Sequence, residues 1–115
     1  MSIRLLTVAM LLGPFVGVAT AQAEKPELFR TDVYVGGRDG YHTYRIPAMV
    51  VTGKGTILAF CEGRKKNPRD VGDIDLLLKR SDDDGQTWSA QQIIHEEGGD
   101  APITIGNPCP IVDRS

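Results

Sequence analysis

The sequence predicts an all-β protein built around one antiparallel sheet, and three observations lead to this class. The apolar segments of residues 24–115 are short and bounded by Gly, Pro and Asp, which is typical of strands joined by turns. No stretch in this region repeats apolar residues at the helical spacing of about 3.6 residues. Several segments are continuous apolar runs, which indicates strands buried on both faces.

Four strands are expected to follow one another as a meander, at residues 46–52, 56–62, 73–80 and 87–95. The turn Gly53-Lys54-Gly55 joins the first two strands, and the tight turn Asp83-Asp84-Gly85 joins the last two, because glycine tolerates the positive φ of hairpin turns. A polar loop over residues 63–72 separates the two middle strands.

A single meander cannot bury both faces of its own sheet, whereas the blades of a β-propeller can, because each blade packs on its neighbours. Residues 107–113, which follow a glycine-rich crossing, look like the inner strand of a next blade. We therefore expect one blade and the start of a second. A closed ring takes about four to eight blades, so the chain is expected to be a truncated piece.

Residues 1–23 have the features of a secretory signal peptide. Arg4 provides a positive start, Leu5–Val18 is an apolar stretch too short to span a bilayer comfortably, and Ala21-Gln22-Ala23 fits a cleavage site. A retained membrane anchor is the alternative. We expect residues 24–115 to be exported, periplasmic or secreted, with no stable membrane insertion after cleavage.

The composition argues against several function classes. The chain has 13 Lys and Arg against 15 Asp and Glu, an acidic balance that does not suggest nucleic acid. His42 and His95 lack metal-ligand spacing, and no phosphate loop or serine nucleophile elbow occurs, so no metal or cofactor is expected. Cys61 and Cys109 lie in apolar runs, which favours two buried free thiols over a disulfide.

The run that begins at Ser81 has five residues at a fixed spacing, namely Ser81, Asp83, Gly85, Thr87 and Trp88. An aspartate can accept hydrogen bonds from backbone N–H groups of its own turn, glycine can close the turn, and tryptophan can pack under the hairpin. Three consecutive aspartates leave calcium binding as an alternative, but the spacing differs from an EF-hand loop. We favour a structural role.

Strand direction sorts the polar residues onto two ends of the sheet. Arg45, Arg64, Asp70 and Asn107 are expected on one rim, and the aspartate-rich turn at the opposite end. Arg45 and Arg64 would form a cationic corner for a carboxylate, although Arg45 alone could be a solvated strand end. Asp70 could transfer a proton, provided that it lies away from these arginines, which oppose keeping a proton on a carboxyl group.

The remaining charged residues near this rim are expected to have ordinary roles. A solvated loop is the favoured interpretation for Lys65, Lys66 and Arg69. Asp73 and Asp75 begin a strand and are expected to take part in turn hydrogen bonds.

In this order, the motifs resemble the start of the bacterial-type exo-sialidases, or neuraminidases. The matching pieces are Tyr44-Arg45-Ile46-Pro47, Glu62-Gly63-Arg64, Asp70 to Asp75, the run Ser81 to Trp88, called an aspartate box in this family, and Asn107-Pro108-Cys109-Pro110. An aspartate box alone also occurs in unrelated β-proteins, so the ordered set carries the resemblance. It implies a six-bladed propeller, a glycoside hydrolase, and retaining hydrolysis of terminal α-linked sialic acids on glycoproteins, glycolipids and oligosaccharides.

The resemblance also implies residue roles. Arg45 matches the first of three arginines that clamp the substrate carboxylate, Arg64 an arginine near the 4-hydroxyl, Asp70 the general acid/base, and Asn107 a residue lining the pocket. The tyrosine nucleophile of this family and its glutamate partner lie further along in sialidases, so this chain is expected to be an N-terminal part without turnover of its own. A sialic-acid-binding lectin or adhesin, which would keep Arg45 without needing Asp70, is the alternative. The two arginines argue against a purely structural propeller.

Overall fold

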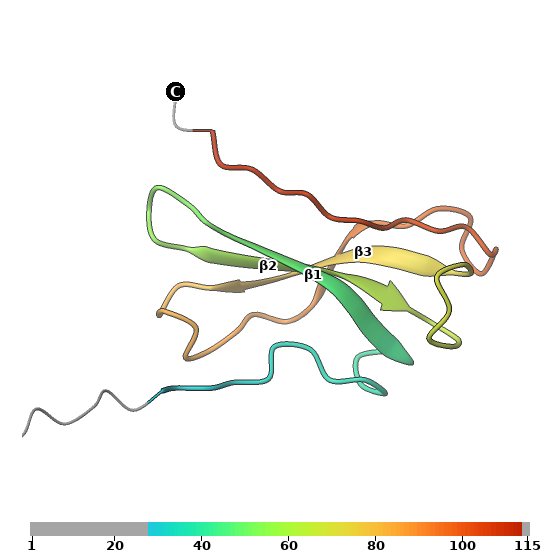
Figure 1. Cartoon of the computed structure of the whole chain (residues 1–115), viewed down its shortest axis with the longest axis horizontal. Helices are drawn as coiled ribbons and strands as arrows, with labels where there is room; N and C mark the ends of the chain where they lie inside the picture. The colour runs from blue at the N-terminus through green and yellow to red at the C-terminus, as the bar shows by residue number, and fades with distance from the viewer. Residues whose placement is uncertain (1–27, 114–115) are drawn as a thin grey trace, which may run out of the picture.

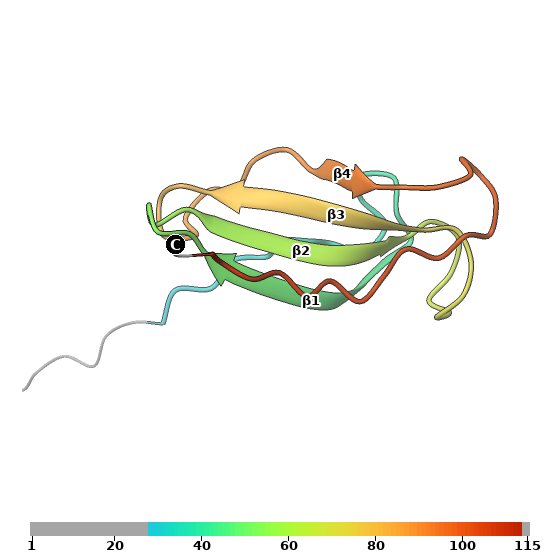
Figure 2. The ribbon, with the colours of Figure 1, turned by 90° about the horizontal axis from the view of Figure 1, so that it is seen from above.

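Four strands form one antiparallel sheet in the order β1-β2-β3-β4, as Figures 1 and 2 show. The computed structural model describes residues 28–113, and its strands are β1 (Thr43–Val51), β2 (Ile57–Arg64), β3 (Ile74–Ser81) and β4 (Gln92–His95). The predicted all-β class and the meander order are confirmed. The predicted signal peptide lies outside the described residues, and none of residues 28–113 forms a helix long and apolar enough to cross a membrane.

The ends of the strands differ from the prediction. Arg45 lies inside β1 and Arg64 is the last residue of β2, whereas both were expected beside strands. The fourth strand begins at Gln92 instead of residue 87, because the Ser81–Trp88 run folds into a turn of its own. Residues 107–113 form no strand, and the nearest β-pairing is the isolated bridge between Ile74 and Thr104, which lies before this segment.

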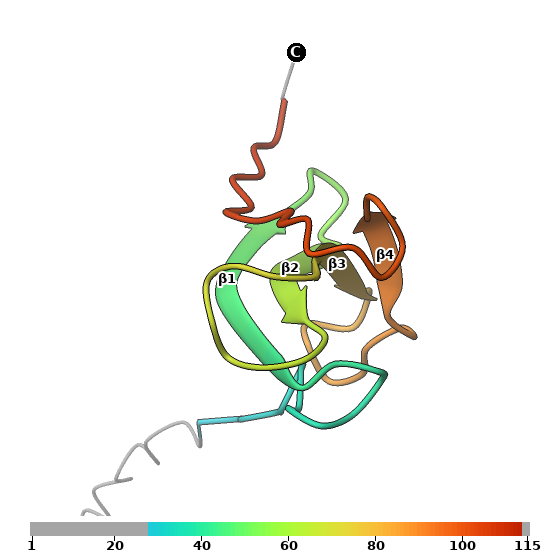
Figure 3. The same ribbon diagram turned by 90° about the vertical axis from the view of Figure 1, so that its right-hand side faces the viewer.

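The antiparallel register places directly opposite residues on the same face of the sheet. One face, which we call the site face, carries Glu62 and Arg64 of β2. The other, the core face, carries Cys61 and its partner Leu77. The segment before β1 lies over the core face, and the segment after β4 lies over the site face, as the views in Figures 1 and 3 agree.

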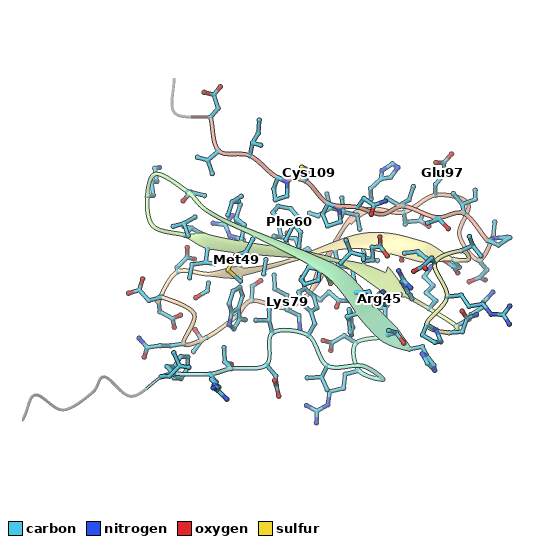
Figure 4. All side chains as sticks on the ribbon, viewed as in Figure 1. Arg45, Met49, Phe60, Lys79, Glu97 and Cys109 are labelled. Carbon is cyan, nitrogen blue, oxygen red and sulfur yellow. The ribbon has the colours of Figure 1, made fainter. Side chains whose placement is uncertain are left out.

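Aromatic rings and β2–β3 side chains form the small core on the core face. Tyr41, Cys61 and Leu77 are buried together, and Leu77 has no exposed surface. Burial raises the pKa of the Cys61 thiol to about 12, so this cysteine is unreactive at neutral pH. Both cysteines are free, but the expectation that Cys109 is buried is wrong, because it lies exposed on the segment after β4 (Figure 4).

The expectation that the strands are buried on both faces holds only for the centre of the sheet. The covering segments are irregular, and β2 and β3 are the strands that they bury. The outer strands keep apolar side chains in solvent, with Met49 57%, Val51 55% and Ile93 56% exposed. Figure 4 shows Met49 on β1, away from both covering segments.

Gly63 connects the core to the site face. A Cβ at this position would lie 2.3 Å from Leu77 Cδ1 and 2.7 Å from two atoms of the Tyr41 ring. The glycine therefore lets the ring pack directly on the backbone of β2. Its neighbours Glu62 and Arg64 point to the opposite face, because successive side chains in a strand alternate. In the Glu-Gly-Arg motif, Gly63 therefore packs against the core, and the two charged residues on either side of it face the site.

Candidate functional site

A β-bulge in β1 sets the direction of Arg45. The register with β2 shifts between Arg45 and Ala48. Ile46 has a φ of 53°, in the left-handed region that a β-branched residue rarely adopts. Pro47, which follows it, has no N–H to offer a neighbouring strand. Such strained backbone persists only where surrounding structure holds it, and it is frequent at functional sites.

Arg45, Arg64 and Asp70 meet at one rim of the sheet. Asp70 Oδ1 lies 2.9 Å from Arg45 Nη1 and 2.8 Å from Arg64 Nη2. The three residues come from β1, from the end of β2 and from the loop that follows β2. Figure 4 places Arg45 at the same end of the sheet as this loop. The side chains of Arg45 and Asp70 are 47% and 78% exposed, so a ligand from solvent could reach both.

The contact between Asp70 and the arginines corrects one expectation. Asp70 was expected to lie away from the cationic corner, but here its carboxylate occupies that corner. The reason is that Arg64 holds the loop by its backbone, through a 2.6 Å hydrogen bond from Nη1 to the Pro68 carbonyl. This contact brings Asp70, two residues later, within reach of both guanidinium groups.

Arg64 differs from Arg45 in being buried. Its side chain is 3% exposed, and its guanidinium donates to Glu62, to Pro68 and to Asp70. All of these acceptors belong to the protein. Arg64 therefore organises the rim in this structure, and a direct contact between Arg64 and a ligand stays a prediction.

The backbone of Asn107 joins the same group of residues. Its N–H donates to Glu62 Oε1 at 3.0 Å, and its φ of 54° is in the left-handed region. The Asn107 side chain lies in an exposed position. Glu62, which connects Asn107 to Arg64, was not assigned a role from the sequence. A carboxylate two residues before Arg64 in one strand must face the same side, and that spacing was the available signal.

A second charged cluster lies on the core face and contradicts two expectations. Lys65 Nζ lies 3.1 Å from Asp73 Oδ1 and 3.4 Å from Asp75 Oδ2, and Asp75 also accepts a 2.5 Å hydrogen bond from the Tyr41 hydroxyl. Lys65 is therefore not a solvated residue, and the two aspartates are buried ion-pair partners rather than turn residues. Burial alone would lower the pKa of Lys65, but Asp73 and Asp75 raise it. The cluster ties together the two ends of the loop that carries Asp70.

None of the three tyrosines of the chain is arranged as a nucleophile within residues 28–113. Tyr41 donates a hydrogen bond to the Asp75 carboxylate, yet its side chain is only 5% exposed. Burial is the main cause that raises the pKa of Tyr41, and the contact with Asp75 raises it further. Burial also raises the pKa of Tyr34, and raises that of Tyr44 to about 12. Their hydroxyls donate to the backbone carbonyls of Ala59 and Arg38.

The aspartate box closes on itself at the opposite end of the sheet (Figure 1). Ser81 Oγ accepts a 2.8 Å hydrogen bond from the Gly85 N–H and lies 2.8 Å from Asp83 Oδ1. Asp83 accepts from both the backbone N–H and the hydroxyl of Thr87, at 2.9 Å and 2.5 Å. Trp88 Nε1 donates to the Gly85 carbonyl, and Gly85 has a φ of 84°. These contacts are local, so the box stabilises its own turn.

This geometry predicts how the aspartate box responds to acid. The hydroxyl and then the N–H of Thr87 lower the pKa of Asp83 from 3.8 to about 2. Because the folded-state pKa is below the unfolded value, the ionised Asp83 stabilises the fold above pH 3.8, and this contribution is lost as the pH falls towards 2. We expect Asp83→Asn to reduce the loss of unfolding free energy across this interval, as measured by urea unfolding at a series of pH values. The exposed Asp32→Asn is the matched control, and equal pH slopes for the two variants would refute the prediction.

The fold and the rim define a class: an antiparallel β-sheet protein with a structural aspartate box at one end and an arginine–aspartate group at the other. Comparison with known proteins agrees with this class. No family model matches the sequence. The chain is 47% identical over 77 residues to an exo-alpha-sialidase of Arthroderma benhamiae, which is 64% of this chain and 19% of the relative. It is 36% identical over 99 residues to a sialidase of Micromonospora viridifaciens, which is 85% of this chain and 15% of the relative.

An exo-alpha-sialidase of Aspergillus fumigatus is 44% identical over 77 residues, again 64% of this chain and 19% of the relative. The chain is thus similar to sialidases over most of its length, as its motifs predict. It spans less than a fifth of the length of these relatives.

Proposed function

We propose that this chain provides part of the substrate site of an exo-α-sialidase, which hydrolyses terminal α-linked sialic acids with retention of configuration. The observation that carries the proposal is the position of Asp70 between Arg45 and Arg64. A sialic acid presents a carboxylate next to its glycosidic oxygen. A guanidinium that binds a carboxylate, with an exposed carboxyl group beside it, matches both features.

In this structure the Asp70 carboxylate accepts a hydrogen bond from Arg45 Nη1, a donor that a substrate carboxylate would need. Binding would replace one carboxylate by another, at no loss of hydrogen bonds to Arg45. The displaced Asp70 would then lie beside the bound sugar. From there it could donate a proton to the leaving oxygen and later accept one from water, as a retaining mechanism requires. Its 78% exposed side chain has room for this movement.

A retaining sialidase also needs a tyrosine nucleophile. The tyrosines of this chain are held in the core or at its edge with raised pKa values. We therefore expect these 115 residues by themselves to bind sialic acid without turning over a sialoside. Hydrolysis would need a nucleophile from additional polypeptide.

The direct test is the release of a fluorescent leaving group from an α-sialoside by a form of the protein that includes the additional polypeptide with the nucleophile. We expect Arg45→Lys to lower kcat/KM by about tenfold or more, because an ammonium cannot replace the planar fork that pairs with a carboxylate. Arg38→Lys, at an exposed position on the loop before β1, is the matched control and should retain full activity. Absence of release, or equal activity of the two variants, would count against the proposed function.

A further inference from the structure

Glu62 lies on the site face near the end of β2, opposite Arg45 and two residues before Arg64. It is 4% exposed, although it carries a charge. A buried carboxylate is costly unless its oxygens are paired and hydrogen-bonded. The hydrogen-bond partners of the Glu62 carboxylate therefore indicate which parts of the chain this residue positions.

The two oxygens of Glu62 have different partners. Oε2 accepts from Arg64 Nε at 3.2 Å and from Arg64 Nη2 at 2.7 Å. Oε1 accepts from the Asn107 N–H at 3.0 Å. One carboxylate thus joins a guanidinium on its own strand to a backbone segment 45 residues further along the chain.

The segment around Asn107 is shaped to make this contact. A Cβ at Gly106 would lie 2.3 Å from Glu62 Oε1 and 2.9 Å from its Cδ atom. Only glycine lets the backbone approach the carboxylate this closely. The left-handed φ of Asn107 then turns the chain so that its N–H reaches Oε1. Figure 2 shows the segment after β4 running along the sheet in front of β1.

We infer that Glu62 is a positioning residue, which fixes the Arg64 guanidinium and the Gly106–Asn107 backbone relative to each other. Its oxygens are occupied by these two partners, so it does not itself bind a ligand or transfer a proton. Arg64 in turn holds Pro68 and Asp70. The orientation of Asp70 therefore depends on Glu62 through Arg64. This role rests on the proposed function for its effect on substrate, but the coupling between the two segments can be measured without it.

The structural arm of the test uses NMR on the whole chain, with the Arg64 Nε–H and the Asn107 amide as probes. In Glu62→Gln, the negative charge is lost while the size is kept, and we expect both signals to shift. Glu62→Asp keeps the charge and should partly restore the Arg64 signal. Glu97→Gln, at an exposed position after β4 (Figure 4), is the matched control and should move neither signal.

A second variant keeps the test valid if Glu62→Gln does not fold. Gly106→Ala leaves Glu62 and Arg64 intact and pushes on the carboxylate from the other side. We expect it to shift the Arg64 Nε–H signal as well, although position 106 is far from Arg64 in sequence. An unchanged Arg64 signal in Gly106→Ala, or an unchanged Asn107 signal in folded Glu62→Gln, would overturn the inference.

The functional arm measures binding of methyl α-sialoside. We expect Glu62→Gln to weaken binding by about 10-fold to 100-fold, the range for losing hydrogen bonds to a charged group, with Glu62→Asp in between. If the unmodified chain does not bind this sugar, the proposed function fails, while the NMR result still decides whether Glu62 couples the two segments. If the NMR signals shift but binding is unchanged, Glu62 does not position the site.

Discussion

Replacing Asp70 with asparagine is expected to lower the turnover of sialosides with poor leaving groups by about 10²–10⁴-fold, the contribution typical of a general acid. Asparagine cannot donate the proton that a sugar hydroxyl needs in order to leave. Sialosides with an acidic phenol as leaving group need less protonation and should lose much less activity. Both substrates would be assayed for kcat and KM in the form of the protein that hydrolyses sialosides, with the exposed Asp32→Asn as control.

The same substitution should leave the affinity for free sialic acid unchanged or higher. The reason is that Asp70 occupies Arg45 in this structure, and an amide competes less well than a carboxylate for a guanidinium. Unchanged turnover in Asp70→Asn would rule out Asp70 as the proton donor. If a form of the protein that includes a nucleophile region bound sialic acid with and without the substitution and hydrolysed no sialoside in either case, the protein would instead be the binding module, a lectin or adhesin.

Replacing Leu77 with alanine is expected to destabilise the fold by about 2–5 kcal/mol, through lost burial and the cavity left behind. Leu77 is fully buried and packs against Tyr41 and Cys61. A domain of this size has a net stability of only about 5–15 kcal/mol, so the loss is a large share of it. Thermal unfolding followed by circular dichroism should show a Tm lower by about 4–8 °C for each kcal/mol lost.

Leu28→Ala makes the same chemical change at a side chain that is 72% exposed, and it should leave the Tm nearly unchanged. If both variants lowered the Tm equally, the Tyr41–Cys61–Leu77 cluster would not be the core of this fold. The result also bears on the site, because Leu77 and Tyr41 pack against Gly63. Loss of this packing would loosen the part of β2 from which the Glu62 and Arg64 side chains project.

Much of the architecture could be predicted from the sequence, because it depends on local rules. Alternation of apolar runs with Gly, Pro and Asp determined the four strands and their order. Strand direction alone was enough to expect Arg45 and Asp70 at one rim, and the structure places them in contact across 25 residues of sequence. The aspartate box was equally accessible, since the hydrogen bonds that close its turn, among Ser81, Asp83, Gly85, Thr87 and Trp88, lie within the run itself.

The tertiary structure decided which charged side chains are buried and which partners they have. Arg64, Asp73 and Asp75 would be solvated in an isolated strand or loop, but they are buried in the folded chain, and Lys65 is partly buried beside the two aspartates. The role of Glu62 could not be read from its motif, because its second partner lies 45 residues away. Local sequence determines which way a side chain points along a strand. The tertiary structure determines which charged side chains are buried, because burying a charge is favourable only when other parts of the chain supply its ion-pair and hydrogen-bond partners.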